Sequence, residues 1–295
     1  MGAMTYNFLT VEPLTSGAVA TALARWLGLS VEDVDVADED TDQDLRNWDA
    51  LVLCEKATVL GDMNTSLDIY VQEAVQPHAG ERDLGVAFAR AADVVVLFPA
   101  EEMPPSAYWL ATEDGLVTRA RLYESDEEEP RFTIDRVEAP VARLPQVTVA
   151  RIPEVVREAK TATPLGDAFV ARVRSSHSEE AGSPGTPLWQ AGNRLCAREK
   201  LVRQMGADWA PSGWYPLDLC RERLEARDKL EGMSAQLPLE AAALLHASLE
   251  PLDALFAEAT VAGPVGLLRG EPAGAESAAP AHGWWWDRRP EPLPW

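Results

Sequence analysis

The sequence has few cysteines and histidines and no long apolar run. Its three cysteines, Cys54, Cys196 and Cys220, are widely spaced over 295 residues, and none belongs to a CxxC pair. This spacing excludes a disulfide framework and fits the reducing cytoplasm. The four histidines are equally scattered, so we predict no zinc site. No apolar run approaches the roughly 18 to 20 residues that span a bilayer, and we expect no membrane segment.

Basic residues are also scarce, and the deficit is concentrated in the first part of the chain. There are 26 Lys and Arg against 48 Asp and Glu, a formal net charge of −22. Residues 1–182 hold 33 acidic and 15 basic residues, or −18 of that total, and residues 183–295 hold −4. Such a field repels nucleic-acid phosphates and anionic membranes and attracts basic proteins. We therefore predict a basic protein partner and no direct nucleic-acid binding; the alternative is that the acidity only keeps the protein soluble.

The common catalytic and cofactor motifs are missing as well. The sequence contains no GxGxxG, GxxxxGK[ST], GxSxG or HExxH. Asp62 and Asp68 flank a predicted turn, and Cys54 lies inside an apolar run, so a structural role fits each better than a catalytic one. His246 lies on a predicted helix, where we expect a core or boundary residue and not a catalytic one. We predict no catalytic residue, no metal and no cofactor.

What the sequence does contain, in its first part, is the pattern of an α+β domain over residues 1–174. Strands are predicted at 6–12, 34–36, 50–60, 66–75, 94–99, 107–113, 116–124 and 131–137, and helices at 18–28, 81–93 and 153–160. Turn-forming residues at 61–66 and the Asp114-Gly115 pair predict two hairpins. The expected fold is therefore an antiparallel-rich sheet with two helices.

The second part of the chain predicts a different architecture. The polar, Gly-, Ser- and Pro-rich stretch 175–187 is typical of a linker. Beyond it, apolar stripes predict helices at 193–206, 216–232 and 237–261, with Pro251 expected to kink the last or to start a new helix. Such stripes need to pack on one another, so we expect residues 188–295 to form an all-α bundle.

Aromatic residues are concentrated in this second part. Trp209, Trp214 and Tyr215 lie in a loop between predicted helices, where they either fill the core or line an interface. The chain ends in HGWWWDRRPEPLPW, whose prolines exclude a helix and favour an extended course. We predict that this tail packs back on the bundle, burying two of the indoles of Trp284, Trp285 and Trp286, with Arg288 and Arg289 stacking on indole faces. The alternative is a docking peptide for another chain.

Three segments of the first part together resemble a known family. These are GDMNTSLDIYV at 61–71, VVVLFP at 94–99 and PSAYWLATEDGLVTRARL at 105–122. In this combination they resemble the small acidic immunity proteins of actinobacterial polymorphic toxin systems. The resemblance covers residues 61–122 only. It implies a non-catalytic α+β protein that neutralises a toxin, and it carries no catalytic residue over to this chain.

These observations lead to one favoured hypothesis and two alternatives. The favoured one is a non-catalytic cytoplasmic binding protein whose acidic domain captures a basic partner, which the resemblance implies is a toxin. Its candidate partner-binding residues are Asp38, Glu39, Asp40, Asp42, Glu101, Glu102, Asp126, Glu127, Glu128 and Glu129. The first alternative is an enzyme or small-molecule carrier with a pocket between the domains, lined by Trp209, Trp214, Tyr215, Trp284, Trp285 and Trp286. The second is a scaffold subunit of a larger assembly.

Overall fold

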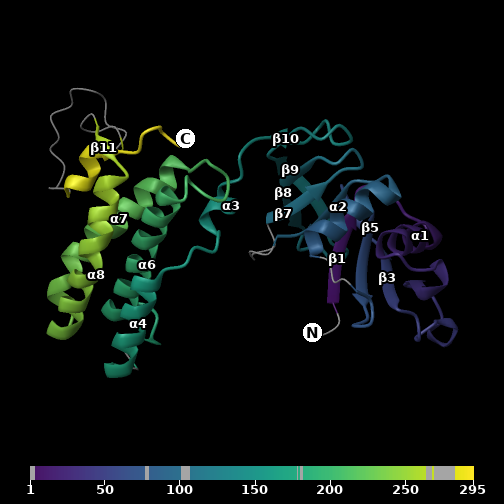
Figure 1. The fold of residues 1–295 in the computed structure, drawn as a ribbon, viewed down its shortest axis with the longest axis horizontal. Helices are drawn as coiled ribbons and strands as arrows, with labels where there is room; N and C mark the ends of the chain where they lie inside the picture. The colour runs from purple at the N-terminus through teal and green to yellow at the C-terminus, as the bar shows by residue number, and fades with distance from the viewer. Residues whose placement is uncertain are drawn as a thin grey trace. The chain divides into compact units, whose positions relative to one another are not determined.

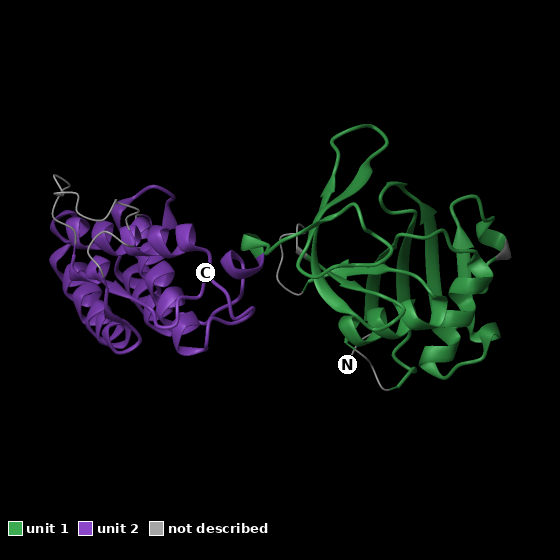
Figure 2. Cartoon of the chain, turned by 90° about the horizontal axis from the view of Figure 1, so that it is seen from above, with its two compact units in different colours: residues 1–154 green, residues 155–295 purple. Residues whose placement is uncertain are grey.

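The computed structural model describes residues 4–76, 80–100, 107–177, 179, 182–263, 268 and 283–295. The chain divides into two compact units, residues 1–154 and 155–295 (Figure 2). This division lies before the linker that the sequence predicts at 175–187. The reason is that helix α4 (Pro164–Ser176) packs on α6 (Pro187–Gly206) and α8 (Leu239–Glu258), and so belongs to the second unit. Among the described residues, no helix has both the length and the apolarity to cross a bilayer.

The first unit is built on one large mixed sheet (Figure 1). Its strands are β1 (Met4–Thr10), β2 (Val34–Asp38), β3 (Val52–Thr58), β4 (Leu60–Gly61), β5 (Thr65–Val71), β6 (Val96–Pro99), β7 (Ala107–Ala111), β8 (Val117–Glu124), β9 (Arg131–Val137) and β10 (Thr148–Val149). The strand order is β10-β9-β8-β7-β6-β1-β5-β3-β2. Most neighbours are antiparallel, as predicted, but β2 with β3, β4 with β9, and β9 with β10 are parallel. The sheet also curls, because β4 follows β3 directly and pairs with β9.

Two helices pack on one face of this sheet. Helix α1 (Ser16–Leu27) begins where the side chain of Thr15 accepts the Ala18 N–H and ends at Gly28, whose φ of +69° suits glycine. Helix α2 is Glu81–Ala92. Helix α2 lies within the predicted range, whereas α1 begins two residues before its predicted start at 18. The short 3-10 helices η1 (Val31–Asp33) and η2 (Gln43–Leu45) flank β2.

The first unit has two hydrophobic cores on opposite faces of the sheet. Along β6, the alternate residues Val96 and Phe98 face the helices, whereas Leu97 faces the other side. The helix-side core joins α1 and α2 to β1, β3 and β5. The second core lies inside the curl formed by β6 to β9 and is completed by Leu144 and its neighbours after β9. Both faces of β6 are thus buried, whereas Tyr123 on β8 and Thr133 on β9 are exposed on the side away from the second core.

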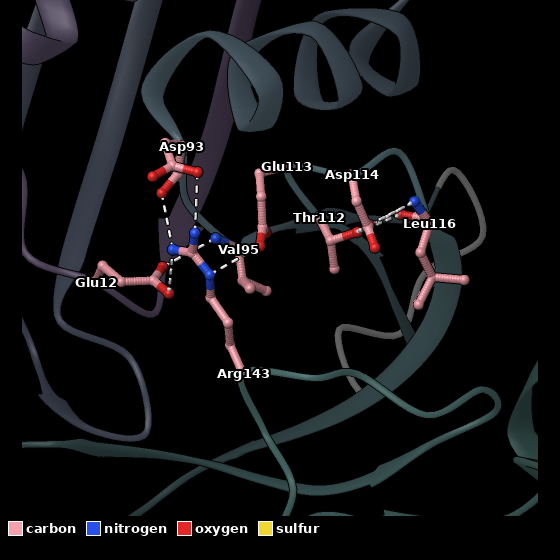
Figure 3. Close-up of polar contacts among 8 residues, drawn as sticks. All are labelled: Glu12, Asp93, Val95, Thr112, Glu113, Asp114, Leu116 and Arg143. Atoms are coloured by element: carbon pink, nitrogen blue, oxygen red, sulfur yellow. Dashed lines mark hydrogen bonds and ion pairs between the residues drawn. The ribbon is translucent and has the colours of Figure 1, made fainter.

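A single arginine ties the loop after β9 to three other parts of the unit (Figure 3). The Arg143 guanidinium donates to Glu12 at 2.9 Å, to Glu113 at 2.9 Å, and to both the carboxylate and the main-chain oxygen of Asp93. Glu12 in turn accepts the Val95 N–H at 2.9 Å. These carboxylates raise the pKa of Arg143, with the hydrogen bond to Glu12 as the largest cause. The end of β1, the start of β6 and the β7–β8 turn are therefore held by one cation.

The second unit is mainly helical, but it is not all-α as predicted. Its elements are α3 (Pro153–Arg157, which begins in the first unit), α4, α6, α7 (Leu217–Met233), η3 (Ser234–Gln236), α8, η4 (Trp284–Asp287), and strands β11 (Val261–Ala262) and β12 (Arg288–Arg289). Helix α8 continues through Pro251, so no new helix starts there. The two short strands pair antiparallel because the extended tail returns to the end of α8.

The tail packs on the bundle in the way the sequence predicts. Trp285 and Trp286 are 2% and 4% exposed, whereas Trp284 is 45% exposed. The indole N–H groups of Trp285 and Trp286 both donate to the carboxylate of Asp228 on α7, at 2.9 and 2.8 Å. The Arg288 guanidinium lies 6.0 Å from the Trp284 ring centroid, while Arg289 pairs with Glu291 instead of stacking. One carboxylate therefore satisfies both buried indoles.

Replacing Arg143 with glutamine should destabilise the first unit. Arg143→Gln removes most of the bonds to Glu12, Asp93 and Glu113, and we expect a loss of about 1–2 kcal/mol because the site is partly exposed and screened. Urea unfolding followed by circular dichroism measures this change. Arg151→Gln is the matched control, since Arg151 is half-exposed and lies 3.9 Å from Glu138. An equal effect of the two substitutions would contradict the role given to Arg143.

Replacing Asp228 with asparagine should loosen the tail. Asp228→Asn offers one acceptor where two buried indole N–H groups need one each, and we expect a loss of about 1–3 kcal/mol. Tryptophan emission should also shift to longer wavelength because the indoles become hydrated. Glu225→Gln on the same helix is the control, as its side chain is exposed and, among the described residues, pairs with Lys229 alone. Unchanged emission and stability in Asp228→Asn would show that the indoles do not depend on this carboxylate.

Candidate functional site

The predicted acidic residues belong to two different parts of the sheet. Asp38 ends β2 at the sheet edge, Glu39 and Asp40 follow in the turn, and Asp42 caps η2. The other group, Asp126, Glu127, Glu128 and Glu129, lies at the tip of the β8–β9 hairpin. Five strands stand between β2 and β8 in the sheet order, so the two groups do not share a strand pair. The remaining candidates, Glu101 and Glu102, lie outside the described residues.

The region around β2 carries the larger number of acidic residues. Residues 31–49 contain nine acidic residues and one basic residue. Four of the nine have structural roles: Asp33 and Asp42 cap 3-10 helices, Asp35 pairs with Arg46, and Asp38 binds Lys56 and Ser16. The hydrogen bonds from Lys56 and Ser16 lower the pKa of Asp38. These contacts hold the edge strand and its flanking turns in place.

The other five acids in this region are exposed and are not used by the fold. Within the described part of the chain, no side-chain hydrogen bond or ion pair is found for Glu32, Glu39, Asp40, Asp44 or Asp49. Each therefore lies at the surface without a counterion among the described residues. We call these five residues the free acidic group.

The sheet face next to this group is open to solvent. Cys54 and Ile69 are fully buried on the side of α1 and α2, so the neighbouring residues Glu55 and Asp68 point to the opposite face. Two rows run across the four strands on this side: Asn7, Asp68, Glu55 and Ala37; and Thr5, Tyr70, Leu53 and Asp35. Glu55, Asp68 and Tyr70 are exposed there. We call the side of β1, β5, β3 and β2 that these rows define the open face.

Two like charges meet at the centre of the open face. Glu55 on β3 and Asp68 on β5 are directly opposite in the register. Like-charged side chains in that relation destabilise a sheet. Arg46 relieves part of this repulsion, since its guanidinium lies 3.2 Å from Glu55 and 2.9 Å from Asp35. Asp68 has no such partner among the residues that the structure describes.

A shallow hollow of about 340 Å³ lies over this part of the open face. Its charged lining consists of Asp38, Glu39, Glu55 and Asp68 against Arg46 and Lys56. The hollow therefore brings two of the predicted residues, Asp38 and Glu39, together with Glu55 and Asp68, which were not predicted as binding residues. The alternation in LVLCEKAT and SLDIYV carries the missing signal, because it places both acids on the polar side of their strands.

Two large aromatic side chains lie near these acids. Tyr70 is 42% exposed in the row beside Asp68, and Trp48 is 55% exposed just after η2. The Arg46 guanidinium lies 4.5 Å from the Trp48 ring centroid, and the indole N–H donates to the Gln43 main-chain oxygen. Exposed tyrosine and tryptophan are typical of protein-binding surfaces.

The six aromatic residues predicted as a pocket or docking site are used differently. Trp209, Tyr215, Trp285 and Trp286 are buried in one hydrophobic cluster of the second unit. Trp214 is partly buried against the same cluster, and Trp284 is exposed beside Phe256. Most of this set is therefore core, because the tail and the α6–α7 loop pack together at one end of the bundle, where the Tyr215 N–H donates to the Pro294 oxygen.

The reactive residue types show little sign of activation. Burial raises the pKa of Cys54 to about 12 and that of Cys220 also to about 12, so both thiols are protonated near neutral pH. His246 is exposed on α8. Over the described ranges, no three His, Cys, Asp or Glu side chains are grouped so that they could hold a metal ion. The chemistry that the open face does offer is electrostatic attraction of cations.

Comparison with known proteins gives no match, either to a protein-family model, to a curated protein or to a solved structure. The function is therefore argued from the geometry of this chain.

Removing the charge of Asp68 should stabilise the first unit. Asp68→Asn relieves the repulsion with Glu55, and we expect a gain of about 0.5 kcal/mol, within the range for cross-strand pairs. The free energy of unfolding in urea measures it. Asp49→Asn removes the same charge from an exposed residue outside the sheet and should change stability less. A loss of stability in Asp68→Asn would show that this carboxylate supports the fold.

Proposed function

We propose that the protein is a non-catalytic binding protein whose first unit captures a basic protein partner. The observation that carries this proposal is the free acidic group, five exposed carboxylates without a counterion among the residues that the structure describes. A partner with clustered lysine or arginine side chains would supply the missing charges. Charge on a surface of this kind acts mainly on the rate and specificity of association.

The charge balance of the unit supports the same proposal. Residues 1–154 hold 29 acidic and 11 basic residues, a formal charge of −18, whereas residues 155–295 hold 19 and 15, or −4. Long-range attraction of a basic protein by such a unit raises the association rate and weakens as salt screens it. An excess of acid that served solubility alone would not need to be concentrated in one unit.

The resemblance to immunity proteins suggests a narrower form of this proposal. In that form the partner is a toxin and its capture is neutralisation in the cytoplasm. Segments 61–71 and 107–122, which carry much of the resemblance, form β4, β5, β7 and β8 of the same sheet. β5 also carries Asp68 and Tyr70 of the open face.

Affinity capture with a charge-neutralised variant tests the proposal. The variant E32Q/E39Q/D40N/D44N/D49N removes the free acidic group, and D208N/D218N/E225Q/E231Q/E240Q removes five exposed acids from the second unit. Each protein is immobilised, loaded with lysate of the native host and eluted with a salt gradient. We expect a basic protein that wild type and the second variant retain and the first variant loses.

Association kinetics of the recovered partner complete the test. At low salt the first variant should associate at least tenfold more slowly than wild type, and its rate should depend less on salt. Retention of the same proteins by all three columns, or a partner whose association is indifferent to salt, would contradict the proposal.

A further inference from the structure

The open face has the features of a docking surface for an extended polypeptide. We propose that a lysine- or arginine-bearing segment of the partner binds along it, with one cationic side chain between Asp68 and Glu55. This inference rests on the proposed function and adds the place and the chemistry of the contact. Its grounds are the charge of the hollow, the exposed aromatic residues and an unsatisfied donor.

The net negative charge of the hollow favours a positively charged ligand. The hollow holds four carboxylates against two cations, and both of those cations are already engaged, Arg46 by Asp35 and Glu55, and Lys56 by Asp38. Asp68 is left without a partner in the described structure, directly opposite Glu55. A cation placed between them would turn a repulsive cross-strand pair into two attractive contacts.

The aromatic side chains favour an arginine or lysine over a simple inorganic cation. Tyr70 lies in the row next to Asp68 and exposes 42% of its surface. A guanidinium or an alkyl-ammonium side chain that reaches Asp68 can pack its carbon atoms or its planar group on this ring. Arg46 already makes such a contact within the protein, 4.5 Å from the Trp48 ring centroid.

A buried donor at the hollow favours a polypeptide over a small polyamine. The side chain of Arg46 is only 1% exposed, and it lines the hollow. Its Nε and Nη1 atoms bind carboxylates, but its Nη2 atom is buried and has no hydrogen-bond partner in the described structure. A buried donor without an acceptor is unfavourable. Because Nη2 has almost no accessible surface, a ligand reaches it only after the Arg46 guanidinium turns toward the hollow. A main-chain carbonyl of a bound segment would then supply the acceptor, and a polyamine has none to offer.

Two ligands of equal charge test whether the open face prefers a polypeptide to a polyamine. The first is an acetylated and amidated tetra-arginine peptide and the second is spermine, each carrying four positive charges. Both are titrated into the full-length protein at low salt, with backbone amide chemical shifts followed by NMR. We expect the peptide to bind at least fivefold more tightly than spermine, with the largest shifts on β3 and β5.

Matched variants locate the contact. Asp68→Asn should weaken peptide binding about fivefold, the value of one partly exposed charge pair, although it leaves the fold intact or more stable. Asp83→Asn, which removes the same charge from an exposed residue of α2, outside both the hollow and the free acidic group, should change it less than twofold. Equal weakening by the two variants, equal affinity for peptide and spermine, or shifts confined to other strands would overturn the inference.

The same variants distinguish this inference from the proposed function. If wild type retains a basic partner from lysate and Asp68→Asn retains it equally well, the partner binds elsewhere on the unit and only the docking face is wrong. If wild type retains no basic partner, the proposed function itself fails. Retention by wild type and by Asp83→Asn, with loss in Asp68→Asn, supports both.

Discussion

The pairing register of β3 with β5 is the constraint on which the candidate site depends. In this register Cys54 and Ile69 enter the helix-side core while Glu55 and Asp68 face solvent. A slip of one residue would bury the acids and expose the apolar side chains, so the hydrophobic core selects a single arrangement. The acidic pair is therefore placed by packing on the far side of the sheet, and the repulsion that it brings is small compared with the burial that fixes the register.

The first unit has few basic residues, and several of them form ion pairs within the unit. Arg143 binds three carboxylates, Arg121 binds Asp135 and Glu154, and Arg46 binds Asp35 and Glu55. Each cation holds together segments that are distant in sequence. Because so many of the basic groups are committed to such contacts, the excess acid is left at the surface. Within the first unit, some acidic residues therefore form structural ion pairs with arginine, and others remain unpaired at the surface.

The sequence predicts the local elements well and the long-range arrangement less well. The cap at Thr15, the glycine at 28 and the turn at Asp114-Gly115 are local signals, and they mark the two ends of α1 and the β7–β8 hairpin. The parallel pairs of β2 and β9, the β4 closure and the early domain boundary depend on contacts between distant segments, which no short pattern encodes. For the same reason Asp38 and Glu39 were predicted as binding residues, whereas Asp68 was not: density of acid is visible in the sequence, but the opposition of Glu55 and Asp68 requires the register.

The structure of the second unit argues against two roles for its aromatic residues, a docking peptide and an aromatic pocket. A docking peptide needs free side chains. The indole N–H groups of Trp285 and Trp286, however, donate to Asp228, and their rings are buried in the bundle. A pocket lined by Trp209 and Tyr215 meets the same difficulty, since both pack into that cluster. Most of these aromatic residues therefore form the hydrophobic core at the end of the bundle where the tail and the α6–α7 loop meet. With the tail indoles committed to stability, the exposed binding chemistry of the described chain is concentrated in the acids of the first unit.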